Sequence, residues 1–384
     1  MKRFKSILSG GLVAITVFSL WVMSGCSSSS SSTPAPTLNL LQLMSSSAYK
    51  QSTTVTADKA LDSLVKYINI YPDLVTKLSG STAYTIFAPS NTAFISLLAT
   101  PGFPSNIKLI NPAIIEGVLM YHIVAGQKLQ SSFTPAASLA TLYTDPATST
   151  VQNIVINSDG TLKTGSTNQS IQIVVANQLA TNGVFHITGS VLIPPSVGST
   201  LTPILGTIAG TVLLGASFTD LAQIIAVADA GFTQNPGTGQ FKISTWLAMP
   251  VSGATVTANT NGLTFFAIPN AVFAAAAAQQ GITEAQLVGA LSSSSSAARS
   301  LLLNHLVVTG KYTVHAGTGS TQYTNSQSIT TMGAGITVTV TTPGTSTGPY
   351  GIVLTNANSK QAYIAQEVLS PNNGVLEVIA GILQ

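Results

Sequence analysis

Side chains that could carry chemistry are few in this chain of 384 residues, which has 4 His, 1 Cys and 11 Asp and Glu together. A zinc site needs three or four converging ligands. No two histidines stand at ligand spacing, since the nearest pair, His305 and His315, is 10 positions apart. We therefore expect neither a metal nor a cofactor.

Paired carboxylates are the next candidates for catalysis. Asp58 and Asp62 are one helical turn apart, but Lys59 and Lys66 lie beside them, so a solvated helix face is the better interpretation. A glycosidase needs two carboxyls facing each other across a cleft, and the sequence nominates no such pair. We also expect no serine nucleophile elbow and no phosphate-binding glycine loop. The sequence indicates no catalytic residue, and we interpret the protein as a non-enzyme.

The histidines lie in apolar surroundings. His122 stands between Leu119 and the pair Ile123-Val124, and His186 and His305 have similar neighbours. Buried polar groups are normally hydrogen-bonded inside the protein. We therefore expect these histidines to be buried, with ring nitrogens bonded to backbone groups.

The start of the chain has the order of a secretory signal. Three basic residues, Lys2, Arg3 and Lys5, precede a mostly apolar run over 7–23. The run ends in Met-Ser-Gly before Cys26, an order that resembles the lipobox of bacterial lipoproteins. Cys26 is the only cysteine, so no disulfide can form within the chain, and lipidation would account for a lone thiol in an exported protein.

These features predict a lipoprotein signal peptide over 1–25, lipid attachment at Cys26 and a Ser- and Pro-rich tether over 26–37. Beyond the leader, charges, Gly and polar residues interrupt every apolar run before it is long enough to span a bilayer. The lipid would then be the membrane anchor. We expect an exported, membrane-anchored protein at the outer membrane or cell surface.

Charge argues against nucleic acid as a partner. The chain carries 14 Lys and Arg against 11 Asp and Glu, for a net charge of +3, and the leader holds three of the basic residues. The remainder is formally neutral, without the basic cluster that phosphate backbones require. Charged residues make up only 7% of the chain. Low charge reduces repulsion between copies, so weak self-association stays open.

Three stretches recur in order in the two halves of the sequence. The first copies are Tyr84–Phe94, Leu119–Leu129 and Asn182–Pro194, and the second copies are Leu263–Phe273, Leu302–Tyr312 and Asn373–Leu383. An amphipathic helical pattern precedes each set, with Leu61, Leu64, Val65 and Ile68 in one and Leu221, Ile224, Ile225 and Ala228 in the other. A strand ending at Pro89 or Pro269 follows each helix, and Asn91 or Asn270 can begin the next one.

Alternating strands with Gly and Asn turns complete each copy, for example around Ser158-Asp-Gly160, which reads as a hairpin turn. Helices and strands in this order predict an α+β fold, with helices packed on antiparallel sheet. The length suits two domains.

The Phe-Ala-Pro-Ser-Asn-x-Ala-Phe segment, the Tyr121-His122 pair and the Asn182-Gly-Val-Phe-His-Ile closure resemble the motifs of the fasciclin (FAS1) family. The resemblance implies two FAS1-like domains, each an antiparallel β-sheet wedge or sandwich with several helices, at 38–197 and 198–384. The second is divergent: Asn304 replaces Tyr121, Glu377 replaces His186, and an insertion spans about 233–262.

The same resemblance implies a non-catalytic cell-adhesion protein that recognises an extracellular glycan, matrix or cell-surface protein. The alternative is a self-associating structural protein of the envelope or biofilm matrix. A hydrolase would need a clustered acid pair or triad in the folded protein. The family links the Tyr-His region to partner binding, which makes Tyr121 and His122 candidates, and Trp246 is a third candidate because long insertions often carry function.

Overall fold

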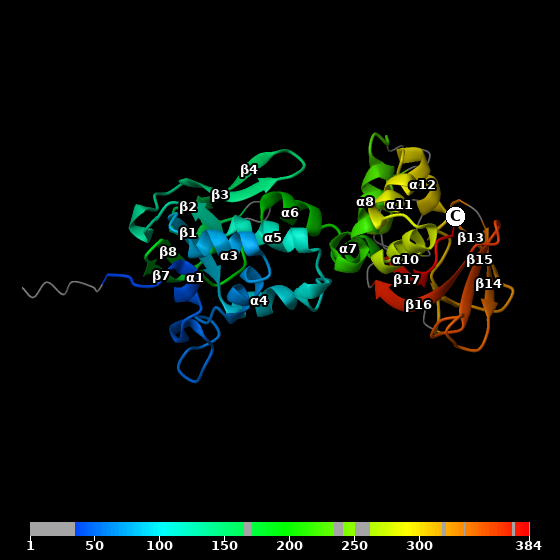
Figure 1. Cartoon of the computed structure of the whole chain (residues 1–384), viewed down its shortest axis with the longest axis horizontal. Helices are drawn as coiled ribbons and strands as arrows, with labels where there is room; N and C mark the ends of the chain where they lie inside the picture. Colours follow the sequence, from blue (N-terminus) through cyan, green and yellow to red (C-terminus); the bar gives the residue numbers. More distant parts are fainter. Residues whose placement is uncertain are drawn as a thin grey trace, which may run out of the picture. The chain divides into compact units, whose positions relative to one another are not determined.

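The structure is a computed structural model that describes residues 35–164, 170–233, 241–249, 262–316, 320–333, 335–370 and 373–383. The predicted signal peptide, Cys26 and most of the tether lie outside these residues, as do 234–240 and 250–261 of the predicted insertion. The described part contains two large sheets, each with its own helices (Figure 1), and one two-stranded sheet. The predicted α+β class is confirmed.

The first half is built on an eight-stranded sheet with the order β6-β5-β4-β3-β2-β1-β8-β7. Its helices are α1 (Leu40–Met44), α2 (Asp62–Ile68), α3 (Pro72–Ser79), α4 (Asn91–Leu98), α5 (Pro112–Tyr121) and α6 (Pro195–Leu201), with short 3-10 turns η1 (Ser47–Tyr49), η2 (Ile107–Leu109) and η3 (Gln130–Ser132). Its strands are β1 (Tyr84–Pro89), β2 (Ile123–Ala125), β3 (Ser138–Asp145), β4 (Thr150–Ile156), β5 (Leu162–Lys163), β6 (Ser170–Ile171), β7 (Ile173–Ala180) and β8 (Gly183–Thr188).

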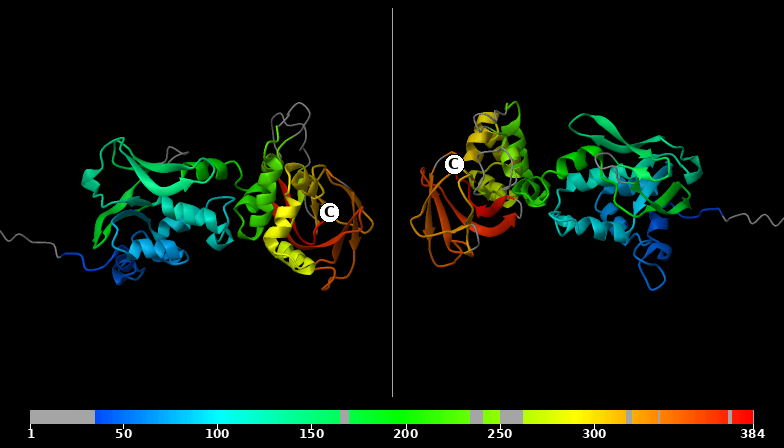
Figure 2. Two further views of the ribbon diagram at one scale, coloured as in Figure 1. Left: turned by 45° about the horizontal axis from the view of Figure 1, so that its top comes forward. Right: turned by 180° about the vertical axis from the view of Figure 1, so that it is seen from behind.

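The second half has a seven-stranded sheet, β10-β9-β17-β16-β15-β14-β13, and a separate β11-β12 pair. Its helices are α7 (Ile208–Leu214), η4 (Ala216–Phe218), α8 (Thr219–Asp229), α9 (Ile243–Ala248), α10 (Asn270–Gln280), α11 (Glu284–Leu291) and α12 (Ser295–Leu303). Its strands are β9 (Leu263–Ala267), β10 (Leu306–Val307), β11 (Tyr312–Thr313), β12 (Thr321–Gln322), β13 (Ser328–Thr330), β14 (Gly335–Val340), β15 (Ile352–Asn356), β16 (Gln361–Ser370) and β17 (Gly374–Ala380). Figure 2 shows the helices of each half gathered beside its strands.

Each of the two large sheets contains both parallel and antiparallel strand pairs, which corrects the expectation of a purely antiparallel sheet. Strand β1 pairs with β8 in parallel, with Tyr84 opposite Gly183, and β9 pairs with β17 in parallel, with Leu263 opposite Gly374. The other pairs in the two large sheets are antiparallel. In each large sheet the parallel pair lies one strand in from an edge, and it joins the first repeated stretch of that half to the third.

The strands of the two parallel pairs are buried on both faces, which explains their apolar sequences. Successive side chains of a strand point to opposite faces. Ile86 and Ala88 of β1 therefore face the core formed with α1–α5, whereas Phe87 packs with Tyr121 and the strands β3–β5. The amphipathic helices were predicted correctly, since the apolar positions of α2 and α8 are largely buried in the two cores.

A run of serines over 292–296 leads into α12. Ser294 caps the N-terminus of this helix by accepting a hydrogen bond from the Ala297 amide at 3.1 Å. Serine is a strong N-cap residue, so a serine run can begin a helix. The part of the predicted insertion that the structure describes contains helix α9.

Gly183 provides a test of the parallel pair of β1 and β8. Its φ is +143°, and a Cβ there would collide with the Tyr84 carbonyl oxygen on β1. Gly183→Ala should lower the free energy of unfolding of the first half by about 3 kcal/mol or more, since both strain and steric overlap are introduced. Urea unfolding of the full chain measures this change.

Gly160→Ala is the matched control, because Gly160 also has a positive φ, +79°, but a Cβ there meets nothing within 4 Å. It should cost only about 1 kcal/mol. Equal losses for the two variants would contradict the close approach of β8 to β1.

Candidate functional site

The histidine motif ends helix α5 and ties it to two other segments. His122 is the C-cap residue of α5; its Nδ1 lies 2.6 Å from the Val118 carbonyl oxygen, and its Nε2 accepts a hydrogen bond from the Leu192 amide at 2.9 Å. Its own carbonyl accepts from the Phe87 amide of β1 at 2.9 Å. Burial lowers the pKa of His122 to about 4, so the ring is neutral at pH 7.

His305 repeats these contacts in the second half. Its Nδ1 lies 2.8 Å from the Leu301 carbonyl oxygen and its Nε2 accepts from the Leu383 amide at 3.2 Å. The Phe266 amide donates to its carbonyl at 2.9 Å. Burial also lowers the pKa of His305 to about 4. The prediction that these two histidines are buried and bonded to backbone groups is confirmed.

The asparagine of the closing motif fastens the helices to the sheet. Asn182 Oδ1 accepts from the Leu40 amide at 2.7 Å, and its Nδ2 donates to the carbonyls of Leu78 and Gly80 at 2.9 and 2.7 Å. In the second half Asn373 accepts from the Ile208 amide at 3.0 Å and donates to the Leu247 carbonyl at 2.6 Å.

A second asparagine in each half, Asn91 or Asn270, makes another shared polar contact. Asn91 accepts from the Ser63 amide at 2.9 Å at the start of α2, and Asn270 accepts from the Asp220 amide at 3.2 Å at the start of α8. Helices α4 and α10 begin at these asparagines as predicted, although Ser90 is the residue that caps α4.

A threonine of the first strand of each parallel pair completes the set. Thr85 donates to the Gly126 carbonyl and accepts from the Lys128 amide, and Thr264 does the same with Gly310 and Tyr312. The two halves thus share one design of internal hydrogen bonds.

The halves differ at one buried position of the closing strand. His186 lies opposite Phe87 and Glu377 lies opposite Phe266 in the two parallel pairs. His186 is bonded as predicted: its Nδ1 accepts from the Asn177 amide at 3.2 Å, and its Nε2 lies 3.0 Å from the Lys128 carbonyl oxygen. Burial lowers the pKa of His186. Glu377 is completely buried, and neither carboxyl oxygen is hydrogen-bonded to a described residue.

The three predicted partner-binding residues lie inside the folded protein. Tyr121 and His122 are 0% and 1% exposed, and the Tyr121 hydroxyl donates to the Asn153 carbonyl at 2.8 Å. Trp246 is 2% exposed and packs edge-on against Phe241, with ring centres 5.3 Å apart. The structure brings Tyr121 and His122 together in one core and places Trp246 in the other. A partner could touch these side chains only after the surrounding backbone had moved.

The acidic residues take positions that sequence reasoning missed in part. Asp58 and Asp62 are exposed as predicted, and Asp62 accepts from the Gln51 amide at 2.8 Å. The second half contains two acid pairs that were not nominated, one of Asp220 with Glu284 and the other of Glu367 with Glu377.

Neither pair has the arrangement of a glycosidase, whose carboxyls stand apart with substrate between them. Within each pair one acid is close enough to the other to raise its pKa. Burial and the neighbouring Glu284 raise the pKa of Asp220 to about 6. Among the described residues no three His, Cys, Asp or Glu side chains are grouped to hold a metal ion.

One serine motif was also overlooked. Gly344-Thr-Ser-Thr-Gly348 has the letters of a nucleophile elbow, which joins a strand to a helix. Here it lies in the connection between the antiparallel strands β14 and β15 and lacks that context.

Comparisons with known proteins find matches to part of the chain. Residues 59–194 match the family model of the Fasciclin domain. Protein sll1483 of Synechocystis is 32% identical over 124 residues, which are 32% of this chain and 62% of that protein. Immunogenic protein MPB70 of Mycobacterium bovis is 31% identical over 144 residues, 38% of this chain and 64% of that protein. The chain spans less than two thirds of the length of these curated relatives.

Among solved structures, a FAS1 domain pair from the insect cell adhesion molecule fasciclin I aligns over 84% of this chain and 96% of that chain, with 16% identity and a TM-score of 0.31. Residues 59–194 therefore contain a fasciclin domain. Domains of this family are generally adhesion-related and typically not enzymes.

The buried histidines predict loss of stability in acid. His122 and His305 have pKa values of about 4 in the folded protein against 6.5 for an unburied ring. The unfolded chain therefore takes up more protons below pH 6.5, so their contribution is fully present above that pH and is lost as the pH falls through about 4. Each histidine should account for on the order of 3 kcal/mol.

Urea unfolding of the full chain between pH 7 and pH 4 checks this expectation. His122→Gln keeps a hydrogen-bonding side chain without a titrating ring, so proton uptake on unfolding of the first half should drop by about one proton. An unchanged proton uptake in that variant would show that His122 is not the responsible group.

The closing asparagine gives a second test. Asn182→Ala leaves two buried backbone groups, the Leu40 amide and the Leu78 carbonyl, and the part-buried Gly80 carbonyl without this partner, and it should destabilise the first half by about 3 kcal/mol. Asn153→Ala is the matched control, because the Asn153 side chain is exposed, and it should change stability by about 0.5 kcal/mol or less. Thermal unfolding compares the two variants, and similar melting temperatures would argue against the role of Asn182.

Proposed function

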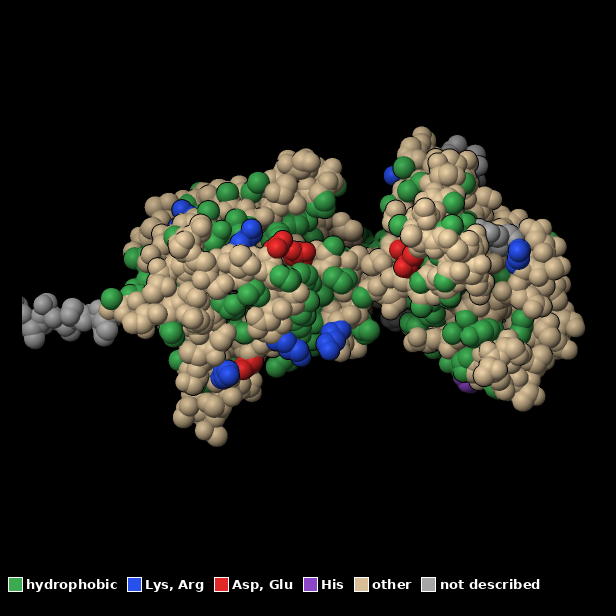
Figure 3. All heavy atoms as spheres, in the orientation of Figure 1, with side chains coloured by type: hydrophobic (Ala, Val, Ile, Leu, Met, Phe, Trp, Pro, Cys, Tyr) green, Lys and Arg blue, Asp and Glu red, His purple; other side chains and the backbone are tan. Residues whose placement is uncertain are grey.

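We propose that this protein is a surface-anchored, non-catalytic adhesion protein that binds a glycan, and that the outer face of the second sheet is its binding surface. The fasciclin domain at residues 59–194 supports adhesion, and the low charge of the surface supports an uncharged partner. Most of the face seen in Figure 3 is uncharged, and its charged side chains form only small groups.

The observation that carries the proposal is a row of uncharged polar side chains across four strands. Strand register places Ser328, Thr337, Thr355 and Gln361 side by side on β13, β14, β15 and β16. Three of the four are exposed and Thr355 is half-buried, while their chain neighbours Ile329, Ile336, Val338, Leu354 and Ala362 point into the core.

The next row adds an aromatic ring to this polar row. Thr339, Val353 and Tyr363 are paired across β14, β15 and β16, with Thr339 exposed and Tyr363 half-buried. Neighbouring strands are about 4.8 Å apart, so the hydroxyls form a regular array. Hydroxyl and amide groups can bond to sugar hydroxyls, and the Tyr363 ring can pack on the apolar face of a sugar. We call these seven residues the polar sheet face.

Anchoring remains part of the proposal. The basic and apolar leader followed by Cys26 supports export and lipidation at the membrane, and the tether 26–37 would hold the folded part away from it. In the part of the chain that the structure describes, no helix is long and apolar enough to cross a membrane. The domain limits 38–197 and 198–384 belong to the same proposal.

Self-association is the second candidate, and strand β7 supports it. β7 is an eight-residue strand at the edge of the first sheet, where Val174 and Leu179 are exposed. Exposed edges can pair with another chain, but irregularities such as bulges weaken such pairing. β7 has two register shifts against β8, which favours the glycan-binding function.

Binding of the full chain to a glycan array tests the proposal. Thr337→Val and Thr355→Val remove a hydroxyl but keep the side-chain volume, and each should weaken binding to a retained glycan by about fivefold, for the loss of about 1 kcal/mol. Thr144→Val on β3 is the matched control, since Thr144 is an exposed strand threonine of the first half, and it should leave binding unchanged.

Sedimentation of the same samples measures self-association. Blank arrays together with concentration-dependent assembly would replace the adhesion proposal by the structural one. Binding that is equally strong in all three variants would place the glycan site elsewhere than the polar sheet face.

A further inference from the structure

Two glutamates face each other inside the second sheet. Glu367 of β16 and Glu377 of β17 are directly opposite in the antiparallel register, and both lie on the face toward β11 and β12. Glu377 is 0% exposed and the Glu367 side chain is 12% exposed. Like charges directly opposite on neighbouring strands are destabilising, and burial makes this worse. The two carboxyls cannot both be ionised at low cost.

Among the described residues no cationic side chain is bonded to Glu377. Tyr323 lies beside Glu377 with a buried hydroxyl, and Tyr312 stacks on Tyr323 with ring centres 6.1 Å apart. β9 presents Phe266 opposite Glu377. His315 lies 3.8 Å from Glu367 but is 73% exposed, and theirs is the only ion pair among the described residues.

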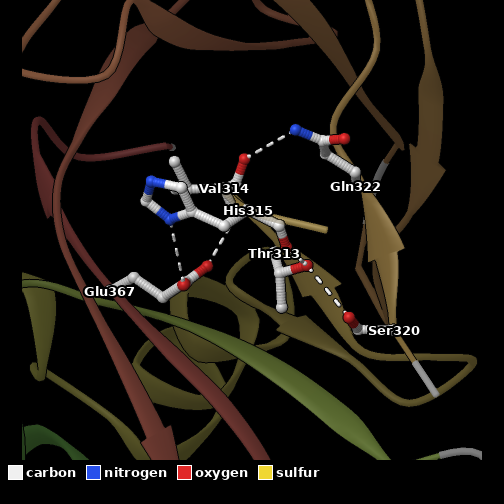
Figure 4. A network of polar contacts seen from close by, with 6 residues as sticks. All are labelled: Thr313, Val314, His315, Ser320, Gln322 and Glu367. Carbon is white, nitrogen blue, oxygen red and sulfur yellow. Dashed lines mark hydrogen bonds and ion pairs between the residues drawn. The ribbon is translucent and has the colours of Figure 1, made fainter. Parts of the chain in front are cut away.

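The Glu367 carboxylate also holds a segment that is otherwise outside the large sheet. Its Oε2 accepts a hydrogen bond from the Val314 amide at 2.5 Å, and its Oε1 faces the His315 ring (Figure 4). Val314 and His315 directly follow β11. We call the described residues 312–316 and 320–323, which contain β11 and β12, the clasp segment.

The first half uses a different group for the same task. His186 occupies the position of Glu377 and holds the Lys128 carbonyl, just after the segment that Thr85 fastens. A neutral imidazole does this without a second titrating partner. The second half instead depends on two carboxyls, of which only one can be ionised at low cost.

We propose that the Glu367–Glu377 pair is a proton-dependent clasp, in which neutral Glu377 allows ionised Glu367 to hold the clasp segment and loss of the proton from Glu377 releases it. On ionisation the repulsion pushes Glu367, which already reaches the surface, toward solvent. The hydrogen bond from the Val314 amide and the contact with His315 are then lost together.

The sign of the pH dependence follows from the proton count. Burial, first, and the charge of Glu367, second, raise the pKa of Glu377 to about 9, far above its usual value of 4.5. In the released state the Glu377 carboxyl is exposed to water and has its usual pKa. Between pH 4.5 and pH 9 the closed state therefore binds one proton more than the released state. The clasp is therefore strongest in acid, weakens as the pH rises and reaches its limit near pH 9. His186, whose pKa is lowered, gives the first half the opposite response.

Limited trypsin cleavage of the full chain tests the clasp at Lys311, the residue before β11. Where cleavage follows the open population, the rate after Lys311 should rise up to tenfold per pH unit from pH 6 to 8 and level off near pH 9. Mass spectrometry of the fragments measures the cleavage rate after Lys311 relative to the rate after the exposed Lys50 of the first half. This ratio corrects for the activity of trypsin itself. Cleavage after Arg299, within α12, should stay constant, because the release is local.

Glu377→Gln is the decisive variant, since glutamine has the same shape and cannot ionise. Its Lys311-to-Lys50 ratio should be independent of pH. A flat ratio in the wild-type chain, or the same rise in both chains, would overturn the proposal, and a parallel rise after Arg299 would replace local release by unfolding of the whole second half.

A second measurement needs no variant. The carboxylic-acid C=O band of neutral Glu377 should be present in the infrared spectrum of the wild-type chain at pH 7 and disappear with the same midpoint as the cleavage ratio. Absence of that band at pH 7 would contradict the proposal even if Glu377→Gln failed to fold.

Discussion

Each half of this protein depends on one parallel strand pair, β1 with β8 or β9 with β17, that is buried on both faces. Such burial removes water from the backbone groups at the ends of the strands, so the protein itself must supply their partners. A threonine, two asparagines and a histidine do this in each half, and they are the residues that recur in the sequence motifs. The motifs therefore record how the strands of each parallel pair are held in the sheet.

The local parts of the fold could be predicted from the sequence. Apolar periodicity gave the helices α2 and α8, and the apolar context of His122 and His305 gave their burial, because both depend on near neighbours in the chain. The parallel pairing was missed, since β8 reaches β1 from about a hundred residues away and no periodicity records the order of strands. Trp246 was predicted as a binding residue because long insertions often carry function. In the structure it lies in α9 with its side chain buried in the core.

The acid pair shows a similar limit. The sequence identified Glu377 as the replacement for His186, but its meeting with Glu367 depends on the register of β16 and β17. That register shifts at an irregularity between Ile364 and Gln366. Because a slip of one residue turns a side chain to the other face of the sheet, no sequence pattern could have brought these two carboxyls together. The polar sheet face depends on strand register in the same way.

The parallel pairing also determines when each half can fold. Tyr84 of β1 pairs with Gly183, and Leu263 of β9 pairs with Gly374. Each parallel pair can therefore form only after nearly the whole half has been synthesised. Contacts between residues so distant in sequence slow folding, since the loop must close first. In each half the strand that completes the parallel pair, β8 or β17, follows every other strand of its sheet along the chain, so this contact is among the last of the sheet to become available as the chain is made.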